Sequence, residues 1–246
     1  MKLEDYLNVL KNDYDGWDNQ YKFVINNINE DISFAYSRFN DGEMMGIKNL
    51  GSVVARGDQL ITQSLQNHLK KSIKHKQKNY FIGVPCSICY LDYYNLANSL
   101  VGDYEYKVSA VACTNRNWAK FITELTQVIK GKKIRFISGS DQKVSFLTEK
   151  MNFNIVDHIK LPNKNTWQYF SDIKNYYKNI NENDIIFISL GPTSRILSQM
   201  WFEKKPNSTY IDIGSILDPF TRNVRHNCHI GWEKGFNKTK KCEICN

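Results

Sequence analysis

Two acidic residues, Asp41 and Glu43, are separated by one residue and follow closely after an alternating apolar stretch at 32–36 that predicts a β-strand. If the backbone continues in extended form, both carboxylates point to the same side, because strand side chains alternate with a period of two. Gly42 has no side chain, so a ligand can approach the main chain. Two carboxylates beside such an opening suit Mg²⁺ or Mn²⁺, which take one or two carboxylates together with substrate phosphates. The nearby guanidinium of Arg38 suits those phosphates.

Other acid pairs with the same spacing occupy different positions. The pairs at 103/105 and 182/184 come just before apolar runs, at the amino ends of predicted strands. The pair Asp41 and Glu43 follows a strand, and open α/β sheets bind ligands at the carboxyl ends of their strands. The alternative is that Asn-Asp-Gly forms a turn and that Glu43 is a solvated neighbour.

The composition indicates a soluble globular protein. At 246 residues the chain can form one sizeable domain or two small ones, and 41% apolar and 24% charged residues are ordinary values. No apolar run is long enough to cross a bilayer, and the start at 1–5 is too polar for a signal peptide. We therefore expect a cytoplasmic protein without a transmembrane segment.

The formal net charge of +8 suggests anionic partners. Lysines cluster at 70–78 and at 130–133. These clusters fit either solvated helix ends or a basic nucleic-acid-binding module. We favour the solvated ends, and we do not expect nucleic acid as a partner.

Cysteines near the end of the chain suggest a structural zinc site. Cys242 and Cys245 have the spacing of a zinc knuckle, and Cys228 with His226 or His229 would supply the remaining ligands of a tetrahedral Zn²⁺. The alternative is that these cysteines are reduced thiols, as expected in a cytoplasmic protein.

Apolar runs that predict strands alternate with amphipathic stretches that predict helices. The predicted strands are at 32–37, 80–84, 106–112, 133–138, 154–159, 184–190 and 209–213. The predicted helices are at 60–73, 118–129, 144–151, 167–177 and 194–202, after a helical lead-in at 3–28. The alternation predicts a single Rossmann-like α/β domain over 1–220, with a mostly parallel sheet and helices on both faces. Residues 221–246 form a tail.

Small, polar and acidic residues follow the later predicted strands. They are Ser138, Gly139 and Asp141 after one strand, Gly191, Pro192, Thr193 and Ser194 after another, and Asp212, Gly214 and Asp218 after the last. Backbone N–H groups at a helix start attract phosphate. Each turn taken alone is also explained by capping. Their convergence with the acid pair on one edge of the sheet favours a ligand site.

Several familiar signatures are absent. The sequence has no Walker A loop, no Gly-x-Gly-x-x-Gly, no Gly-x-Ser-x-Gly and no His-Glu-x-x-His. These absences argue against a P-loop NTPase, a dinucleotide oxidoreductase, an α/β-hydrolase and a zincin.

The segment Arg38-Phe-Asn-Asp-Gly-Glu43 resembles the Arg-Phe-Gly-Asp-Gly-Glu motif of the glycosyltransferases with the GT-D fold. Segments 80–85, 162–167, 190–193 and 211–214 are similar, in the same order, to further conserved segments of that family. Asn40 replaces a glycine of the motif, and Ser215 stands where many members carry a histidine. The resemblance spans 32–218, most of the chain.

The resemblance implies a fold of the GT-D type and transfer of a sugar from a nucleoside-diphosphate sugar, expected to be UDP-linked, to a hydroxyl on a glycan or glycoconjugate. The Asp-x-Glu pair, Asp41 and Glu43, would hold Mn²⁺ or Mg²⁺. The implied donor-binding residues are Arg38, Asn40, Gly42, Ser138, Gly139, Asp141, Gly191, Pro192, Thr193, Ser194, Asp212 and Gly214. The general base is open among Asp141, Asp212, Asp218 and His226, and Asp218 is counted with the catalytic candidates.

Two other functions remain open for the same sequence. With water as acceptor, the acid pair would serve a nucleotide-sugar pyrophosphohydrolase. The lysine clusters would instead belong to the nucleic-acid-binding module described above.

Overall fold

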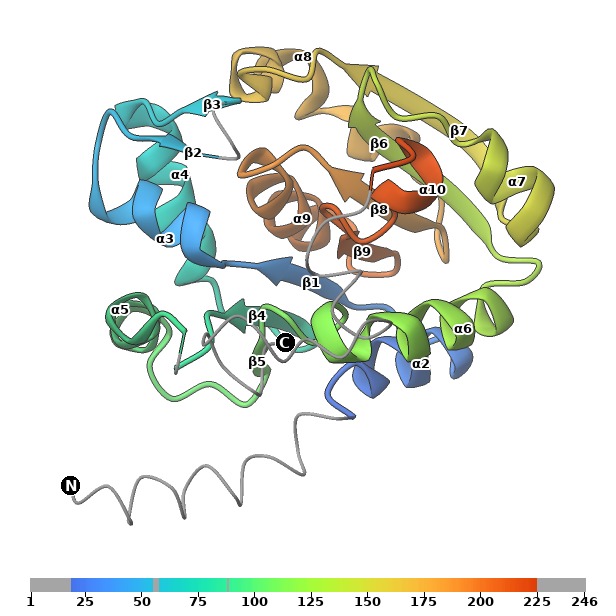
Figure 1. Cartoon of the computed structure of the whole chain (residues 1–246), viewed down its shortest axis with the longest axis horizontal. Coiled ribbons are helices and arrows are strands. Elements are labelled where there is room, and N and C mark those ends of the chain that lie inside the picture. The colour runs from blue at the N-terminus through green and yellow to red at the C-terminus, as the bar shows by residue number, and fades with distance from the viewer. Residues whose placement is uncertain (1–18, 55–57, 88, 225–246) are drawn as a thin grey trace.

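The computed structural model describes residues 19–54, 58–87 and 89–224 (Figure 1). Within them, seven parallel strands form one sheet in the order β5-β4-β1-β9-β8-β6-β7. The strands of this sheet are β1 (Ala35–Arg38), β4 (Tyr80–Val84), β5 (Lys107–Ser109), β6 (Lys133–Gly139), β7 (Asn154–Leu161), β8 (Ile185–Ser189) and β9 (Thr209–Asp212). A separate antiparallel hairpin pairs β2 (Val53–Val54) with β3 (Gln59–Leu60).

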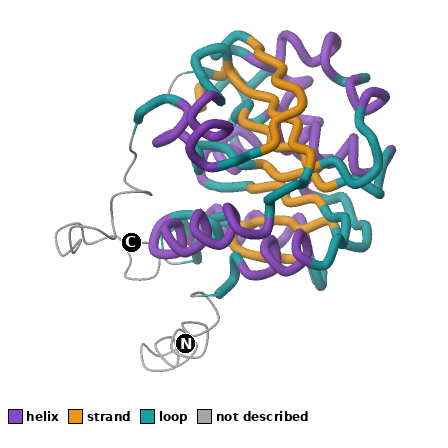
Figure 2. Tube along the Cα trace, turned by 90° about the vertical axis from the view of Figure 1, so that its right-hand side faces the viewer, coloured by secondary structure: helices purple, strands orange, loops and turns teal. Residues whose placement is uncertain are grey.

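Helices cover both faces of the sheet, which lies between them in Figure 2. One face packs against α3 (Asp41–Lys48), α4 (Gln63–Ile73), α5 (Leu91–Val101), α8 (Phe170–Ile173) and α9 (Thr193–Lys204). The other face packs against α2 (Lys22–Asn29), α6 (Trp118–Val128), α7 (Ser145–Met151) and α10 (Asp218–Thr221). Short 3₁₀ segments are η1 (Asn115–Asn117), η2 (Thr166–Tyr169) and η3 (Tyr176–Asn179). This arrangement confirms the α/β class with a parallel sheet.

The central strands are buried on both faces, as expected for a parallel sheet covered by helices. In β8 all five residues are buried. Ile186 and Ile188 join the core under α9, whereas Ile185 and Phe187 join the core under α6. The strand period of two therefore divides one apolar run between two cores.

Two segments have a backbone conformation that differs from the predicted one. Helix α3 begins at Asp41, where extended backbone was expected. The single helix predicted at 167–177 is wrong, because that stretch is divided into η2, α8 and η3. There the carbonyl of Lys174 accepts a hydrogen bond from Nε1 of Trp201 at 2.9 Å, and the N–H of Lys178 bonds instead to the carbonyl of Asn175. Helix α5 and the β2–β3 hairpin were not predicted.

Residues 221 and 222, which follow the domain boundary predicted at residue 220, still contact the α/β domain. The N–H of Lys143 donates to the carbonyl of Thr221 at 2.8 Å, and Arg222 pairs with Asp141. The zinc candidates Cys228, Cys242 and Cys245, with His226 or His229, lie outside the described residues, so their assignment stays a prediction. No helix in the described part of the chain has the length and apolar character needed to span a membrane.

Candidate active site

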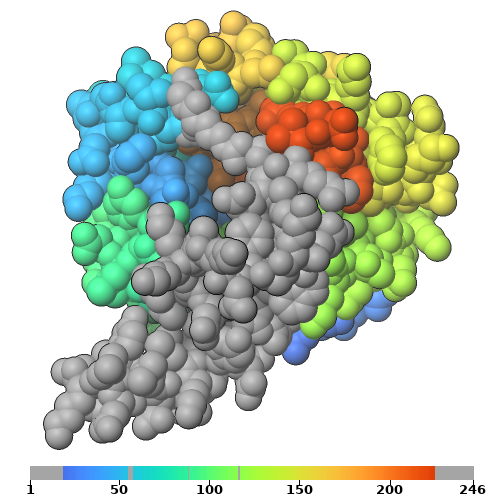
Figure 3. All heavy atoms as spheres, viewed as in Figure 1, coloured from blue at the N-terminus to red at the C-terminus, as the bar shows by residue number. Residues whose placement is uncertain are grey.

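The carboxyl ends of β1, β9, β8 and β6 lie next to one another in the sheet, and the loops that follow them are linked. Nε2 of Gln142 donates to Oγ of Ser189 at 2.7 Å, and that hydroxyl donates to the carbonyl of Gly214 at 2.8 Å. Figure 3 shows this face hollowed, with brown atoms of the β8–α9 region lying deeper than blue atoms of α3 and red atoms of α10.

Helix α3 starts at the end of β1 and determines where the acid pair points. The N–H of Asn40 donates to Oε2 of Glu43 at 3.1 Å, an interaction typical of a capping box. In a helix, residues two apart lie roughly 200° apart around the axis. The expectation that Asp41 and Glu43 share one side is therefore wrong. Glu43 is buried, whereas Asp41 is half-buried and its carboxylate makes no hydrogen bond or ion pair with the described residues.

A buried arginine of α9, Arg195, connects three strand ends. Its Nη2 lies 3.2 Å from Oε1 of Glu43, and its Nε lies 3.0 Å from Oδ2 of Asp212. The same Nε donates to the carbonyl of Arg38 at 2.6 Å, and Nη1 donates to the carbonyl of Gly191 at 2.5 Å. We call these five residues the Arg195 network.

Burial and the arginines act in opposite directions on the two acids of this network. Burial raises the pKa of Glu43, and the positive charge of Arg195 opposes the increase. Burial also raises the pKa of Asp212, opposed by Arg195 and Arg38. Both carboxylates therefore depend on their guanidinium partners to remain ionised.

The side chain of Arg38 lies in the protein interior. Its Nε donates to the carbonyl of Ala110 at 2.9 Å, and its Nη1 donates to the carbonyl of Ile213 at 3.3 Å. Gly214 has φ +48°, and a Cβ there would lie 3.1 Å from Nη1 of Arg38. The arginine thus joins the segments that follow β5 and β9. Its contact with donor phosphates stays a prediction.

The turn before α9 directs its hydroxyls into the fold. Thr193 Oγ1 lies 2.9 Å from Oγ1 of Thr166, and Ser194 Oγ accepts a hydrogen bond from the N–H of Leu190 at 2.8 Å. Pro192 stands just before the first helical residue. The two hydroxyls hold the turn in place, so a ligand here would meet backbone groups.

A second group of polar residues follows β6 and includes α10. Nη2 of Arg222 lies 2.9 Å from Oδ1 of Asp141, and Nη1 lies 3.5 Å from Oδ2 of Asp218. Asp218 is buried, whereas the side chain of Asp141 is 44% exposed. Ser138 is buried, and its Oγ lies 2.9 Å from Nε2 of His158. Arg222 thus joins the loop after β6 to α10.

Two predicted glycines have different surroundings. A Cβ on Gly139 would lie 2.3 Å from Oδ1 of Asn163, so no larger residue fits there without movement. A Cβ on Gly42 would meet only Cβ of Val54, at 3.9 Å. Close packing therefore explains Gly139, whereas the space beside Gly42 is open.

The structure brings the predicted residues together on one edge of the sheet. Some of them belong to the Arg195 network, and others belong to the group of Asp141, Asp218 and Arg222, which we call the Arg222 group. Sequence reasoning missed the central place of Arg195 and the contribution of Arg222. One signal for Arg195 was present, since a cation in the apolar stretch at 193–202 must find carboxylate or carbonyl partners when it is buried.

A model of the family described as "Glycosyltransferase GT-D fold" matches residues 106–238, just over half of the chain. The chain therefore belongs to the glycosyltransferases with the GT-D fold. The matched region includes Arg195, Asp212 and the Arg222 group, and it leaves out the motif at 38–43. A comparison with curated proteins gives no match.

Solved structures show the same fold. A glycosyltransferase from Streptococcus sanguinis with domain of unknown function 1792 has a TM-score of 0.63 and 16% identity, with 80% of each chain covered. A structure of the same domain, described as having a distinct glycosyltransferase fold, has a TM-score of 0.59 and 17% identity, covering 78% of this chain and 76% of that one. A selenomethionine form of the domain has a TM-score of 0.59 and 16% identity, with the same coverage.

Proposed function

We propose that this protein transfers a sugar from a UDP-sugar to a hydroxyl group on a glycan or glycoconjugate, in the cytoplasm and with Mn²⁺ or Mg²⁺. The observation that supports this proposal most directly is the carboxylate of Asp41. It lies at the end of β1, beside the Arg195 network, and has no partner among the described residues. Ligand sites of open α/β sheets lie at this edge.

The residues present fit a divalent cation in one respect. Asp41 offers hard oxygen ligands, and Mg²⁺ or Mn²⁺ needs one or two carboxylates when a diphosphate supplies the other oxygens. Across the described residues, no group of three or more His, Cys, Asp and Glu forms a metal cage. A cation bound here would neutralise the charge that the diphosphate gains as it leaves.

The other groups on this edge have roles that depend on their exposure. The backbone at the start of α9 and the nearby arginines provide a positive environment for the diphosphate. An inverting transfer also needs a general base near the acceptor hydroxyl. Each candidate in the described residues pairs with an arginine, but the carboxylate of Asp141 is 44% exposed, whereas Asp212 and Asp218 are buried. We therefore favour Asp141 as the base.

A thermal-shift experiment with nucleotide sugars tests the proposal. UDP or a UDP-sugar should raise the melting temperature in the presence of Mn²⁺, because a ligand at a hundredfold excess over its Kd stabilises the fold by about 2.7 kcal/mol. The variant Asp41→Asn should lose most of this shift. An unchanged melting temperature across a panel of nucleotide sugars with metal would contradict the donor site. An equal shift in EDTA would keep the donor and remove the metal from the proposal.

A further inference from the structure

Both carboxylate oxygens of Glu43, the second acid of the motif, have partners inside the protein. Oε1 lies 3.2 Å from Nη2 of Arg195, and Oε2 accepts the N–H of Asn40 at 3.1 Å. The side chain is 8% exposed. A metal ligand needs an oxygen directed toward the open site, and the fold directs both oxygens of Glu43 to its own groups.

The partner of Glu43 is itself fixed. Arg195 also bonds to Asp212 and to the carbonyls of Arg38 and Gly191, at 3.0, 2.6 and 2.5 Å. These contacts come from β9, β1 and the turn before α9, so the guanidinium cannot turn away without breaking three other interactions. Glu43 would have to leave a buried cation in order to bind a metal, which is costly at such low exposure.

Asp41 has the opposite surroundings. It is half-buried at the first position of α3, roughly 200° around the helix axis from Glu43, and its carboxylate makes no hydrogen bond or ion pair with the described residues. One carboxylate is sufficient for Mg²⁺ or Mn²⁺ when a diphosphate contributes the remaining oxygens.

We propose that the acid pair is divided in function, with Asp41 as the protein's carboxylate ligand and Glu43 as a positioning residue. This inference rests on the proposed function. Glu43 anchors the first turn of α3 to Arg195 and to the N–H of Asn40, and the position of that turn directs Asp41 toward the cation. The ion pair of Glu43 with Arg195 is therefore part of the metal site, although neither residue touches the metal.

Binding of Mn²⁺ in the presence of saturating UDP, followed by the EPR signal of free Mn²⁺, tests this division without measuring turnover. Asp41→Asn should weaken binding about a hundredfold, and Glu43→Gln and Arg195→Met should each weaken it about tenfold, as is typical when an outer partner of a ligand is lost. Because Glu43 and Arg195 act as one unit, the double variant Glu43→Gln/Arg195→Met should also bind Mn²⁺ about tenfold more weakly, and not a hundredfold more weakly.

The alternative assignment gives a different pattern. If Glu43 were a ligand that competes with Arg195, Glu43→Gln would match Asp41→Asn, and Arg195→Met would bind Mn²⁺ as well as the wild type or more tightly. That result would overturn the division and leave the proposed function intact. Failure of the wild type to bind Mn²⁺ with UDP would overturn both. Melting curves check that each variant is folded, and Arg195→Lys, which keeps the charge and loses the forked geometry, replaces Arg195→Met if that variant does not fold.

Discussion

Asp41 and Asp212 are both acidic residues at the carboxyl edge, but their surroundings give them different chemistry. Asp212 is fully buried, and its Oδ2 forms an ion pair with Nε of Arg195 at 3.0 Å and accepts a hydrogen bond from the N–H of Arg38 at 3.1 Å. It joins the ends of β9 and β1. Asp41 makes no such bond to the described residues and is open to an external cation. Equal charge at this edge therefore does not mean equal function.

At the same scale, His158 should make the stability of the fold depend on pH. Burial lowers its pKa below the ordinary 6.5, and Lys160 lowers it further. As the pH falls through about 6.5, the unfolded chain binds the proton more readily than the folded chain, so stability is lost. His158→Gln should lose less unfolding free energy than the wild type between about pH 7.5 and about pH 5.5. Urea unfolding at several pH values measures this, and parallel curves would show that His158 does not contribute.

At the level of elements, the strands of the central sheet were predictable because parallel strands buried on both faces appear as continuous apolar runs. The run at 80–84 coincides with β4, for example. Helix α3 was not predictable in this way. Gly42 and Gly46 lower its intrinsic helix propensity, and what holds it is the Asn40–Glu43 start together with the burial of Met44 and Ile47.

The candidate site was predictable in part for a related reason. The rule that ligands bind at the carboxyl ends of strands placed Asp41, Ser138 and Asp212 on one edge. The pairing of Glu43 with Arg195 depends on segments that are far apart in sequence, and no local pattern indicates which acid a buried arginine will meet. Local spacing therefore indicated that the site lies at the carboxyl edge of the sheet, but it could not indicate that Asp41 and Glu43 have different surroundings there.

The loop after β6 provides a test at the element scale. Gly139→Ala would place a Cβ 2.3 Å from Oδ1 of Asn163 and 3.3 Å from Nη2 of Arg222, so that the side chain of Asn163 must move. We expect a loss of about 0.5–1.5 kcal/mol in unfolding free energy, because Oδ1 of Asn163 then loses the hydrogen bond from the N–H of Asp141. Gly42→Ala is the matched control, because its nearest neighbour is 3.9 Å away and alanine favours a helix. Denaturant unfolding compares the two, and equal losses would argue against crowding as the cause.

For the whole molecule, the positive charge has a structural explanation. Parallel strands followed by helices direct the helix ends to the edge opposite the candidate site. Lysines occupy the last turns of α4, α7 and α9, where they complement the helix dipole, and they include Lys70, Lys71, Lys150 and Lys204. The net charge of +8 thus does not require a nucleic-acid partner.

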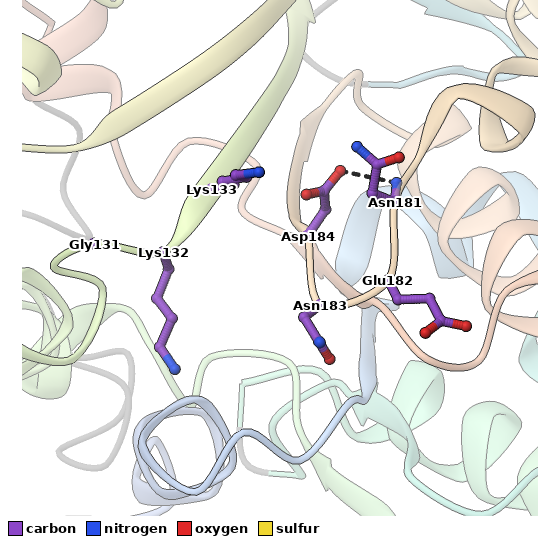
Figure 4. A pocket seen from close by; sticks show the side chains of 7 residues that line it. All are labelled: Gly131, Lys132, Lys133, Asn181, Glu182, Asn183 and Asp184. Atoms are coloured by element: carbon purple, nitrogen blue, oxygen red, sulfur yellow. Dashed lines mark hydrogen bonds between the residues drawn. The ribbon is translucent and has the colours of Figure 1, made fainter.

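A pocket of about 340 Å³ also lies at this opposite edge (Figure 4). It is formed by residues 131–133 and 181–184. Two of the four charged residues that line it are ion-paired, since Lys132 contacts Asp31 and Asp184 lies 2.6 Å from Nε of Arg135. The pocket therefore lies at the amino ends of β6 and β8, and it is separate from the Arg195 network.

The two edges should respond in opposite ways to loss of a carboxylate. Asp184 is buried against Arg135, so Asp184→Asn should cost about 3–5 kcal/mol of stability and leave the activity per folded molecule unchanged. Asp41→Asn should leave the melting temperature unchanged and reduce sugar transfer a few hundredfold, a loss of about 3–4 kcal/mol in transition-state stabilisation. Melting curves and initial rates on the same samples separate the effects.

Exposed acidic residues away from both sites provide the control variants for this comparison. Asp103 and Glu105 are exposed, and swaps to Asn and Gln there should change neither quantity. The 182/184 pair does not provide such a control for stability, because Asp184 is buried and ion-paired. Normal turnover in Asp41→Asn would remove this residue from the reaction.

The pairing of β1 with β9 has a consequence for synthesis on the ribosome. The N–H of Arg38 and the carboxylate of Asp212 are 174 residues apart in the chain. At about 5–20 residues per second, roughly 10–35 s pass between the synthesis of the two. During that time β1 lacks one of its two neighbours, and its unpaired side is open to other chains. A product that ends before β9 lacks Asp212, so premature termination gives a protein without the complete Arg195 network.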